Sequence, residues 1–184
     1  IYLIVVQAMN NRFGLKTILK VIVFSGVGVA LVGLLSATGL INYPKAIIDN
    51  HIASTVGYHN TLATLLSVLS LLGITLMISE KNRWWQVAYY LGIYIMLLVT
   101  FAAVSKGAWI VLLFGLLLLV IGLTSGYRFK AIYFLGIALC SALIVSNYFT
   151  TAMVSEKPLS GLWLTIGGAV VVLVGWAIWK FIEK

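Results

Sequence analysis

Six long apolar runs follow one another along the sequence and constrain its fold more than any other feature. They cover residues 17–40, 61–79, 87–104, 108–124, 131–148 and 160–181. A helix needs about 20 apolar residues to cross the hydrocarbon core of a bilayer, within a range of roughly 17–25. None of the runs has the alternation of apolar and polar residues that a membrane β-strand requires. The sequence therefore predicts an all-α, polytopic transmembrane helical bundle.

The first and last residues add to this prediction. The opening stretch IYLIVVQAM, residues 1–9, is too short to span and has neither a charged n-region nor a small-residue cleavage site, so we do not expect a signal peptide. We interpret it as the end of a truncated helix, and the closing WKFIEK as another helix end. The expected organisation is a single transmembrane domain fragment, residues 1–184, with about six full spans and one truncated span.

The composition excludes a soluble domain. Hydrophobic residues make up 62% of the chain and charged residues 9%, against roughly 45–50% and about 25% in soluble proteins. The net charge of +8 comes from 12 scattered Lys and Arg residues that form no basic stripe. We therefore expect membrane lipids and no nucleic acid among the partners.

The basic residues predict an orientation in the membrane. Nine fall in one set of alternate connections and ends: Arg12, Lys16, Lys20, Lys81, Arg83, Arg128, Lys130, Lys180 and Lys184. The opposite set holds Lys45, Lys106 and Lys157. Because Lys and Arg accumulate in cytoplasmic loops, we expect the loops around these three lysines to face outward.

Several kinds of chemistry lack their usual residues. The four acidic residues, Asp49, Glu80, Glu156 and Glu183, all fall outside the middle of the apolar runs. Ion-coupled transporters usually carry such groups at mid-depth, so this class is disfavoured. No metal-ligand cluster and no glycine-rich phosphate loop is present, so we expect no metal and no cofactor. Cys140, the single cysteine, lies in an apolar run and is expected in the core.

The predicted outward side holds two polar stretches. In the first, INYPKAIIDNHIASTVGYHN (residues 41–60), Asn60 precedes an apolar run, where it can cap the helix or bind a ligand. His59 is either an interfacial polar residue or a base or hydrogen-bond donor to a sugar.

The second stretch is VSKGAW, residues 104–109, in a connection of at most three residues. It holds the ammonium of Lys106 near a helix N-terminus, which carries roughly half a positive charge. The ammonium and the backbone N–H groups of Gly107 and Ala108 form a natural anion site. The alternative is that Lys106 extends to the outer headgroups.

These stretches carry a resemblance to a known family. STVGYHNTLATLL (residues 54–66) and VSKGAWIVLLFGLLLLVI (residues 104–121) resemble the Gly-aromatic-x-Asn and Ser-Arg-Gly-Ala-Trp segments of the O-antigen ligase and O-antigen polymerase family. The likeness covers about residues 17–145. It implies a metal-independent, C-type glycosyltransferase-like bundle in the plasma membrane of a bacterium. Such an enzyme transfers an undecaprenyl-diphosphate-linked glycan to an acceptor glycan or lipid on the outer face.

The resemblance also implies which residues bind the lipid diphosphate and glycan. They are Lys106, Ser105, Gly107, His59 and Asn60, while the catalytic residues are unknown. Lys106 stands where the family has arginine, and lysine offers a point charge in place of a bidentate fork.

The resemblance is incomplete in one further respect. Family members carry a long outer loop, whereas the last outward connection here is only the short stretch FTTAMVSEKPLSG, residues 149–161. We therefore expect the 184 residues alone to be inactive. Two alternatives stay open: a membrane transporter or flippase subunit, and a non-catalytic membrane subunit.

Overall fold

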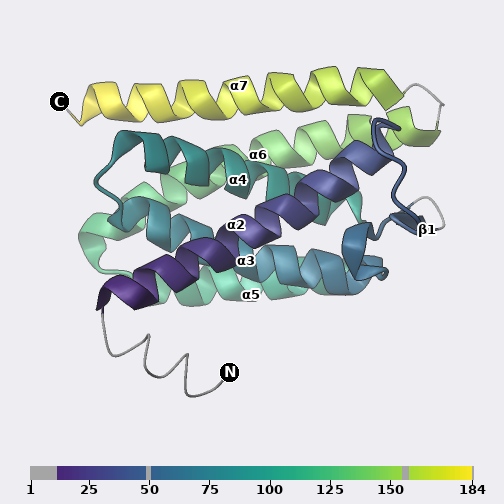
Figure 1. The fold of residues 1–184 in the computed structure, drawn as a ribbon. Coiled ribbons are helices and arrows are strands. Elements are labelled where there is room, and N and C mark those ends of the chain that lie inside the picture. Colours follow the sequence, from purple (N-terminus) through teal and green to yellow (C-terminus); the bar gives the residue numbers. More distant parts are fainter. Residues whose placement is uncertain (1–11, 49–50, 155–157, 184) are drawn as a thin grey trace, which may run out of the picture.

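A computed structural model of the chain describes residues 12–48, 51–154 and 158–183, and within them the protein is a helical bundle (Figure 1). The helices are α2 (Arg12–Ala37), α3 (His59–Ser79), α4 (Arg83–Ala102), α5 (Lys106–Gly122), α6 (Ser125–Val154) and α7 (Pro158–Ile182). Between α2 and α3 lie a short antiparallel hairpin, β1 (Ile47–Ile48) and β2 (His51–Ile52), and a 3-10 turn, η1 (Ser54–Val56). The predicted all-α class is confirmed.

Five of the six predicted spans have a counterpart among the described helices. In the described part of the chain, five helices are long and apolar enough to cross a membrane: Gly14–Ala37, His59–Ser79, Arg83–Ala102, Ser125–Met153 and Ser160–Ile182. The remaining helix, α5, is apolar but has 17 residues. At about 1.5 Å per residue it is shorter than the roughly 30 Å of the hydrocarbon core. The sixth predicted span is therefore not confirmed, and the truncated helix predicted at residues 1–9 lies outside the described residues.

Successive helices run in opposite directions, so the bundle has two distinct ends (Figure 1). One end, which we call the basic end, holds the start of α2, the α3–α4 and α5–α6 turns and the end of α7. The other, the loop end, holds residues 38–48 and 51–58 and the α4–α5 turn, residues 103–105. Two carboxylates of the basic end form ion pairs: Glu80 with Lys16 on α2, and Glu183 with Lys130 on α6.

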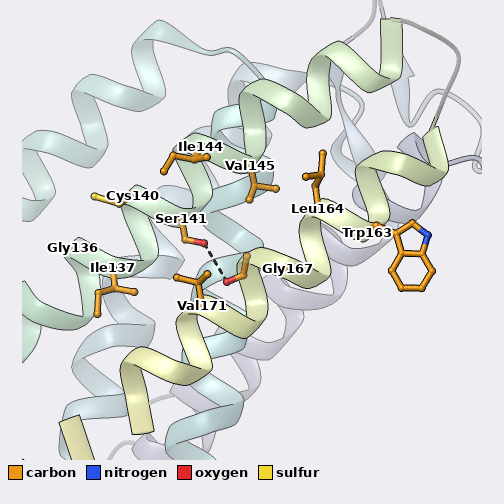
Figure 2. Close-up of a pocket in the computed structure, with 11 residues that line it drawn as sticks. Gly136, Ile137, Cys140, Ser141, Ile144, Val145, Trp163, Leu164, Gly167 and Val171 are labelled. Carbon is orange, nitrogen blue, oxygen red and sulfur yellow. Dashed lines mark hydrogen bonds between the residues drawn. The ribbon is translucent and has the colours of Figure 1, made fainter. Parts of the chain in front are cut away.

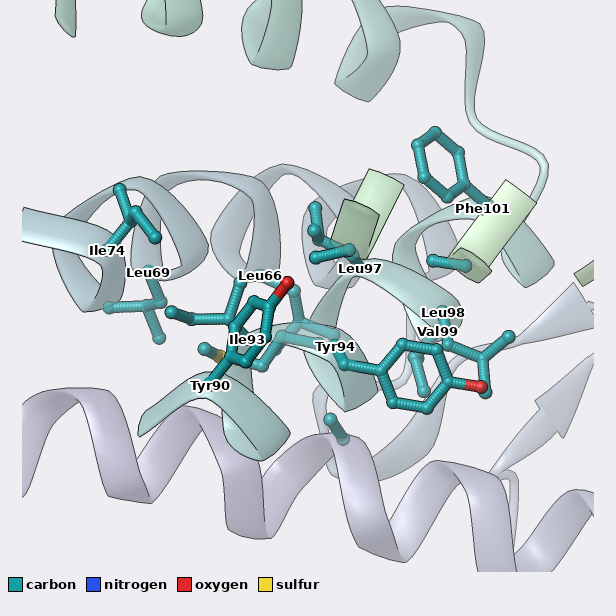
Figure 3. Packing of buried hydrophobic residues seen from close by; sticks show 14 of the residues in the cluster. Leu66, Leu69, Ile74, Tyr90, Ile93, Tyr94, Leu97, Leu98, Val99 and Phe101 are labelled. Atoms are coloured by element: carbon teal, nitrogen blue, oxygen red, sulfur yellow. The ribbon is translucent and has the colours of Figure 1, made fainter. Parts of the chain in front are cut away.

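Helix α4 forms the centre of the bundle and packs against α2, α3, α6 and α7. Tyr90, Tyr94 and Leu97 on α4 are fully buried in the main hydrophobic cluster (Figure 3). Gly92 lets α2 approach closely, since a Cβ there would lie 2.7 Å from a methyl carbon of Val27. Small residues at such crossings are the usual basis of helix packing in membranes.

Two tyrosines of α4 tie the α6–α7 pair to the rest of the bundle. The Tyr90 hydroxyl donates to the carbonyl oxygen of Phe134 at 3.0 Å, and the Tyr94 hydroxyl donates to that of Thr165 at 3.1 Å. A hydroxyl group in hydrocarbon is costly without a partner, so these bonds allow tyrosine inside the bundle.

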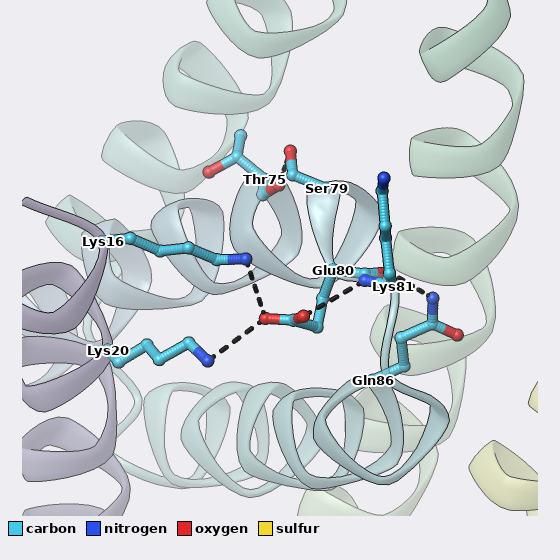
Figure 4. Close-up of polar contacts among 7 residues, drawn as sticks. All are labelled: Lys16, Lys20, Thr75, Ser79, Glu80, Lys81 and Gln86. Carbon is cyan, nitrogen blue, oxygen red and sulfur yellow. Dashed lines mark hydrogen bonds and ion pairs between the residues drawn. The ribbon is translucent and has the colours of Figure 1, made fainter. Parts of the chain in front are cut away.

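A buried carboxylate joins α2 to the α3–α4 turn at the basic end (Figure 4). Oε2 of Glu80 lies 3.1 Å from the ammonium of Lys16 and 3.2 Å from that of Lys20. Its Oε1 accepts from the backbone N–H of Lys81 at 3.1 Å, and the Gln86 amide donates to its carbonyl oxygen at 2.6 Å. Burial alone raises the pKa of Glu80, but the bonds from Lys16 and Lys20 outweigh it and lower the pKa to about 2.

Candidate functional site

The N-termini of α3 and α5 lie next to each other at the loop end. Ala63 on the second turn of α3, Ala103 in the α4–α5 turn and Ala108 on the first turn of α5 form a separate buried cluster. Alanine side chains are short enough to let the two helices approach closely at this point. Because α4 reverses the chain direction between them, α3 and α5 are parallel and both begin here. The polar stretches that contain His59 and Lys106 are thus brought together.

Ser105 caps α5. Its backbone is extended, with φ −94° and ψ 108°, and its Oγ accepts from the N–H of Ala108 at 3.3 Å. Only 2% of Ser105 is exposed. The predicted anion site included the N–H of Ala108, and this part of the prediction is wrong because the serine already accepts that hydrogen bond. The donors that still face outward at this helix end are those of Lys106 and Gly107.

The sequence analysis placed Lys106 in the connection before the helix. In the structure Lys106 is instead the first residue of α5. Its side chain is exposed and has no ion-pair partner within the described ranges. Gly107 is also exposed, and a Cβ added there would meet nothing within 4 Å. The space beside this helix end is therefore open to a ligand.

The turn that leads into α5 contains a strained residue that sequence reasoning missed. Val104 has φ 51°, in the left-handed region, and its N–H donates to the Phe101 carbonyl oxygen at 3.0 Å. Glycine is the usual residue at this position after a helix, and a β-branched residue is an outlier. The only sequence signal was the shortness of the connection. Strain of this kind is common beside functional sites.

Asn60 does not cap α3, so that interpretation of the sequence is wrong. The capping position is Tyr58, with φ −146° and ψ 115°, and its side chain makes no capping bond. Gly57, in the left-handed region with φ 72°, lets the chain turn into the helix earlier than predicted. Asn60 lies inside the first turn, and its Nδ2 donates to the hydroxyl oxygen of Tyr58 at 3.1 Å. The first N–H groups of α3 are left without a side-chain acceptor among the described residues.

His59 stacks on a second histidine. The ring centroids of His59 and His51 are 4.9 Å apart, and the Tyr58 ring is 5.3 Å from that of His59. His51 belongs to β2, and its Nδ1 is buried with no hydrogen-bond partner in the part of the chain described.

The loop that carries His51 is seated on α2. The Ser54 hydroxyl donates to the Val29 carbonyl oxygen at 2.6 Å, and a Cβ on Gly33 would lie 2.8 Å from a methyl carbon of Ile52. The hairpin could not be predicted from the residue pattern, because its strands have two residues each.

A hollow of about 420 Å³ lies beside the start of α3. It is lined by Asn60, Thr61, Thr64 and Leu65. Within the described residues, no group of three His, Cys, Asp or Glu side chains could hold a metal ion. The site thus consists of two helix N-termini, one exposed ammonium, amide and hydroxyl groups, and an imidazole pair. This combination suits an anion that carries polar substituents.

The fold is that of a multi-pass membrane protein, with five helices in the described ranges able to cross a bilayer. Comparisons with protein-family models, with curated proteins and with solved structures give no match. The resemblance to the O-antigen ligase and polymerase family therefore rests on the two sequence stretches alone.

Proposed function

We propose that this protein binds an undecaprenyl-diphosphate-linked glycan at the loop end and contributes to its transfer to an acceptor sugar, as an O-antigen ligase or polymerase does. The observation that carries the proposal is the contact of Ala63 with Ala103 and Ala108. It joins the two stretches that resemble the family into one site.

The electrostatics of this site favour a diphosphate. Each helix N-terminus carries about half a positive charge, and the two helices are parallel, so their fields add. The Lys106 ammonium adds a full charge at the same end. Fixed positive groups stabilise a leaving group on which negative charge develops.

The proposed reaction needs such a leaving-group site. The acceptor hydroxyl oxygen forms a bond to the anomeric carbon, the bond from that carbon to the diphosphate oxygen breaks, and the electron pair leaves with the lipid diphosphate. The hydroxyl proton passes to a base. Lys106 and the N–H of Gly107 would bind the diphosphate, Ser105 would position them, and His59 and Asn60 would contact the glycan. We assign no catalytic residue.

The distribution of basic residues supports an outward orientation of the site. The basic end contains Lys16, Lys20, Lys81 and Arg83 among its charged residues, whereas Lys45 and Lys106 belong to the loop end. Under the positive-inside rule, the loop end faces away from the cytoplasm of a bacterial cell. Glycans on lipid carriers would then meet the site at the outer leaflet.

Binding of farnesyl diphosphate to the protein in nanodiscs tests the proposal. A hydrogen bond to a charged group contributes about 1.5–3 kcal/mol, so Lys106→Ala should weaken binding by about tenfold or more. Lys106→Arg should retain or raise the affinity, because arginine adds a bidentate contact. Lys45→Ala, at the same end of the bundle, is the matched control and should bind normally.

The outcomes separate the competing functions. Equal affinity of the unsubstituted protein and both Lys106 variants would mean that this lysine only reaches the headgroups, and the proposal would be wrong. Diphosphate binding that depends on Lys106, together with movement of the labelled lipid between leaflets of a proteoliposome, would favour the flippase alternative. Transfer of glycan to an acceptor in membranes that contain the protein would support the enzyme.

A further inference from the structure

Positive charge is in excess where the start of α2 meets the α3–α4 turn. Lys16 and Lys20 of α2 pair with Glu80, and Lys81 and Arg83 follow Glu80 within three residues. We call these five residues the basic patch. At neutral pH its four cations and one carboxylate carry a net charge of +3. Among the described residues, the ion pairs of this patch involve no acidic side chain other than Glu80.

The two lysines of α2 converge on a single oxygen atom. The Nζ atom of Lys16 lies 3.1 Å from Oε2 of Glu80, and that of Lys20 lies 3.2 Å from the same atom (Figure 4). One carboxylate neutralises only one of the two ammonium groups, and like charges this close repel each other. The ion pairs of the described residues therefore leave part of the positive charge of the patch uncompensated.

The other two cations of the patch can be reached by an external anion. Lys81 and Arg83 are exposed, and neither has an ion-pair partner in the part of the chain that the structure describes. The Lys81 side chain points away from the Glu80 carboxylate (Figure 4). Lys16 also stays 44% exposed beside its ion pair. An anion that approached the turn would thus meet several positive groups at once.

The patch lies at the level where lipid headgroups meet the hydrocarbon. One membrane-crossing helix ends at Ser79, directly before Glu80, and the next begins at Arg83. Trp84 follows and is 83% exposed, and tryptophan favours the headgroup level of a bilayer. Clusters of basic side chains between membrane helices at this depth suit the headgroups of anionic lipids.

We propose that the basic patch binds the headgroup of an anionic phospholipid from the leaflet at the basic end. The phosphate would contact Lys81 and Arg83, since a guanidinium can bind two phosphate oxygens at once. The acyl chains would extend into the hydrocarbon beside Trp84. The proposal goes beyond the proposed function and does not rest on it, because the candidate glycan site lies at the loop end.

A hollow of about 530 Å³ between α6 and α7 differs from the basic patch in its chemistry (Figure 2). No charged residue lines it, and its one side-chain hydroxyl, that of Ser141, donates to the Gly168 carbonyl oxygen at 3.2 Å. Such a surface has no charge with which to distinguish an anionic headgroup from a zwitterionic one. A comparison of phosphatidylglycerol with phosphatidylcholine therefore reports on the basic patch.

The first experiment measures lipid binding by native mass spectrometry in mild detergent, with equal amounts of phosphatidylglycerol and phosphatidylcholine. The unsubstituted protein should bind mainly phosphatidylglycerol. Each basic residue near the membrane surface strengthens binding of an anionic lipid by about fivefold, so Lys81→Gln/Arg83→Gln should weaken it by about tenfold or more. Neither side chain has an ion pair to lose, so the fold should be retained.

The matched control is Lys130→Gln/Lys180→Gln. It removes two positive charges from the same end of the bundle, but from the residues that pair with Glu183 outside the basic patch. This variant should keep the preference for phosphatidylglycerol. An equal loss of preference in both double variants would mean that anions are attracted to the whole basic end, and the proposal would be wrong. Equal binding of the two lipids by the unsubstituted protein would also overturn it.

The second experiment starts from the unsubstituted protein and uses lipids brominated near the headgroup, which quench tryptophan fluorescence on contact. Brominated phosphatidylglycerol should quench more than brominated phosphatidylcholine at the same mole fraction. The excess should fall at about 1 M salt, where the Debye length is about 3 Å. Trp84→Phe should remove most of the excess, whereas Trp163→Phe should keep it, because Trp163 is 71% exposed but lies on α7 outside the patch.

Three results of this experiment would contradict the proposal. Equal quenching by the two lipids would show that the headgroup charge is not recognised. An excess that persisted in Trp84→Phe would place the lipid elsewhere on the protein. Loss of the excess in millimolar inorganic phosphate at constant ionic strength would mean that the patch binds a free anion and not a lipid.

Discussion

The ammonium of Lys20 lies between the carboxylate of Glu80 and the ring of Trp85. It is 3.2 Å from Oε2 of Glu80 and 4.5 Å from the centroid of the indole ring. Lys20 belongs to α2, whereas the other two residues belong to the turn and helix that follow α3. This contact therefore holds the first described helix against the centre of the bundle at its basic end.

The Glu80 ion pairs should make stability depend on pH at low values. The pKa of Glu80 is lowered from 4.5 to about 2 in the folded protein. Its stabilising effect is therefore complete above about 4.5 and is lost as the pH falls toward about 2. We expect the melting temperature in detergent to be constant from pH 7 to 5 and to fall below that range.

The matched variants for this prediction are Glu80→Gln and Glu183→Gln. The first should lower stability at neutral pH by about 2 kcal/mol, because two lysines lose a carboxylate that is only 9% exposed. It should also reduce the acid-dependent fall. Glu183 is 44% exposed, so its loss should cost less than about 1 kcal/mol. If both variants melted alike at every pH, Glu80 would have no special role.

Neighbouring glycines on α7 should respond in opposite ways to alanine. A Cβ on Gly168 would collide with the Tyr94 hydroxyl and lie 2.9 Å from a methyl carbon of Val145. Gly168→Ala should therefore destabilise the protein by about 1–3 kcal/mol, as overpacking does. Gly167→Ala meets open space and should be neutral or slightly stabilising, since alanine favours helix. Thermal melts of the two variants in the same detergent test this, and an equal loss in both would refute the packing of α7 on α4.

Replacing Val104 with glycine should stabilise the α4–α5 turn. A left-handed backbone costs a residue with a Cβ about 1–2 kcal/mol, and Val104 has φ 51°. The side chain is 48% exposed, so its removal sacrifices little packing. Glycine also raises the conformational entropy of the unfolded chain, which offsets part of the relieved strain. We therefore expect the free energy of unfolding to increase by about 0.5–1 kcal/mol.

Two controls accompany this variant. Val104→Ala keeps a Cβ and should give no comparable gain. Gly39→Ala should lose stability, because Gly39 has φ 73°. A decrease in stability for Val104→Gly would show that this backbone conformation is not the native one.

Cysteine labelling can establish which end of the bundle faces outward. In a Cys140→Ala background, cysteines replace Lys45 at the loop end and Lys81 at the basic end, both of which are exposed. A membrane-impermeant maleimide should label Lys45→Cys on intact cells and Lys81→Cys only after permeabilisation, because basic residues favour the cytoplasm. The reverse result would place the candidate site in the cytoplasm and exclude transfer at the outer face.

The helices could be predicted well from the sequence, because helix formation in a membrane depends on local composition. The apolar run at 61–79 corresponds to helix α3, His59–Ser79, and the run at 87–104 corresponds to helix α4, Arg83–Ala102. The candidate residues were partly predictable. Lys106 and His59 lie at the expected end, but the cap of α3 was assigned incorrectly. The N–H of Ala108, expected in the anion site, instead donates to Ser105. Caps depend on backbone angles and on the hydrogen bonds of neighbouring groups, which the order of residues does not reveal.

By itself, the sequence determined that this is a helical membrane protein and which connections share an end, because hydrocarbon requires internally bonded apolar helices and excludes scattered charges. Only the tertiary structure decided that α3 and α5 begin side by side at Ala63 and Ala108. It also decided that Cys140, which was wrongly expected in the core, is exposed on α6. Apolar helices differ little in composition from face to face. Which faces meet depends on where small residues permit close approach and on a few hydroxyl bonds between helices, and these become apparent only when the helices are packed.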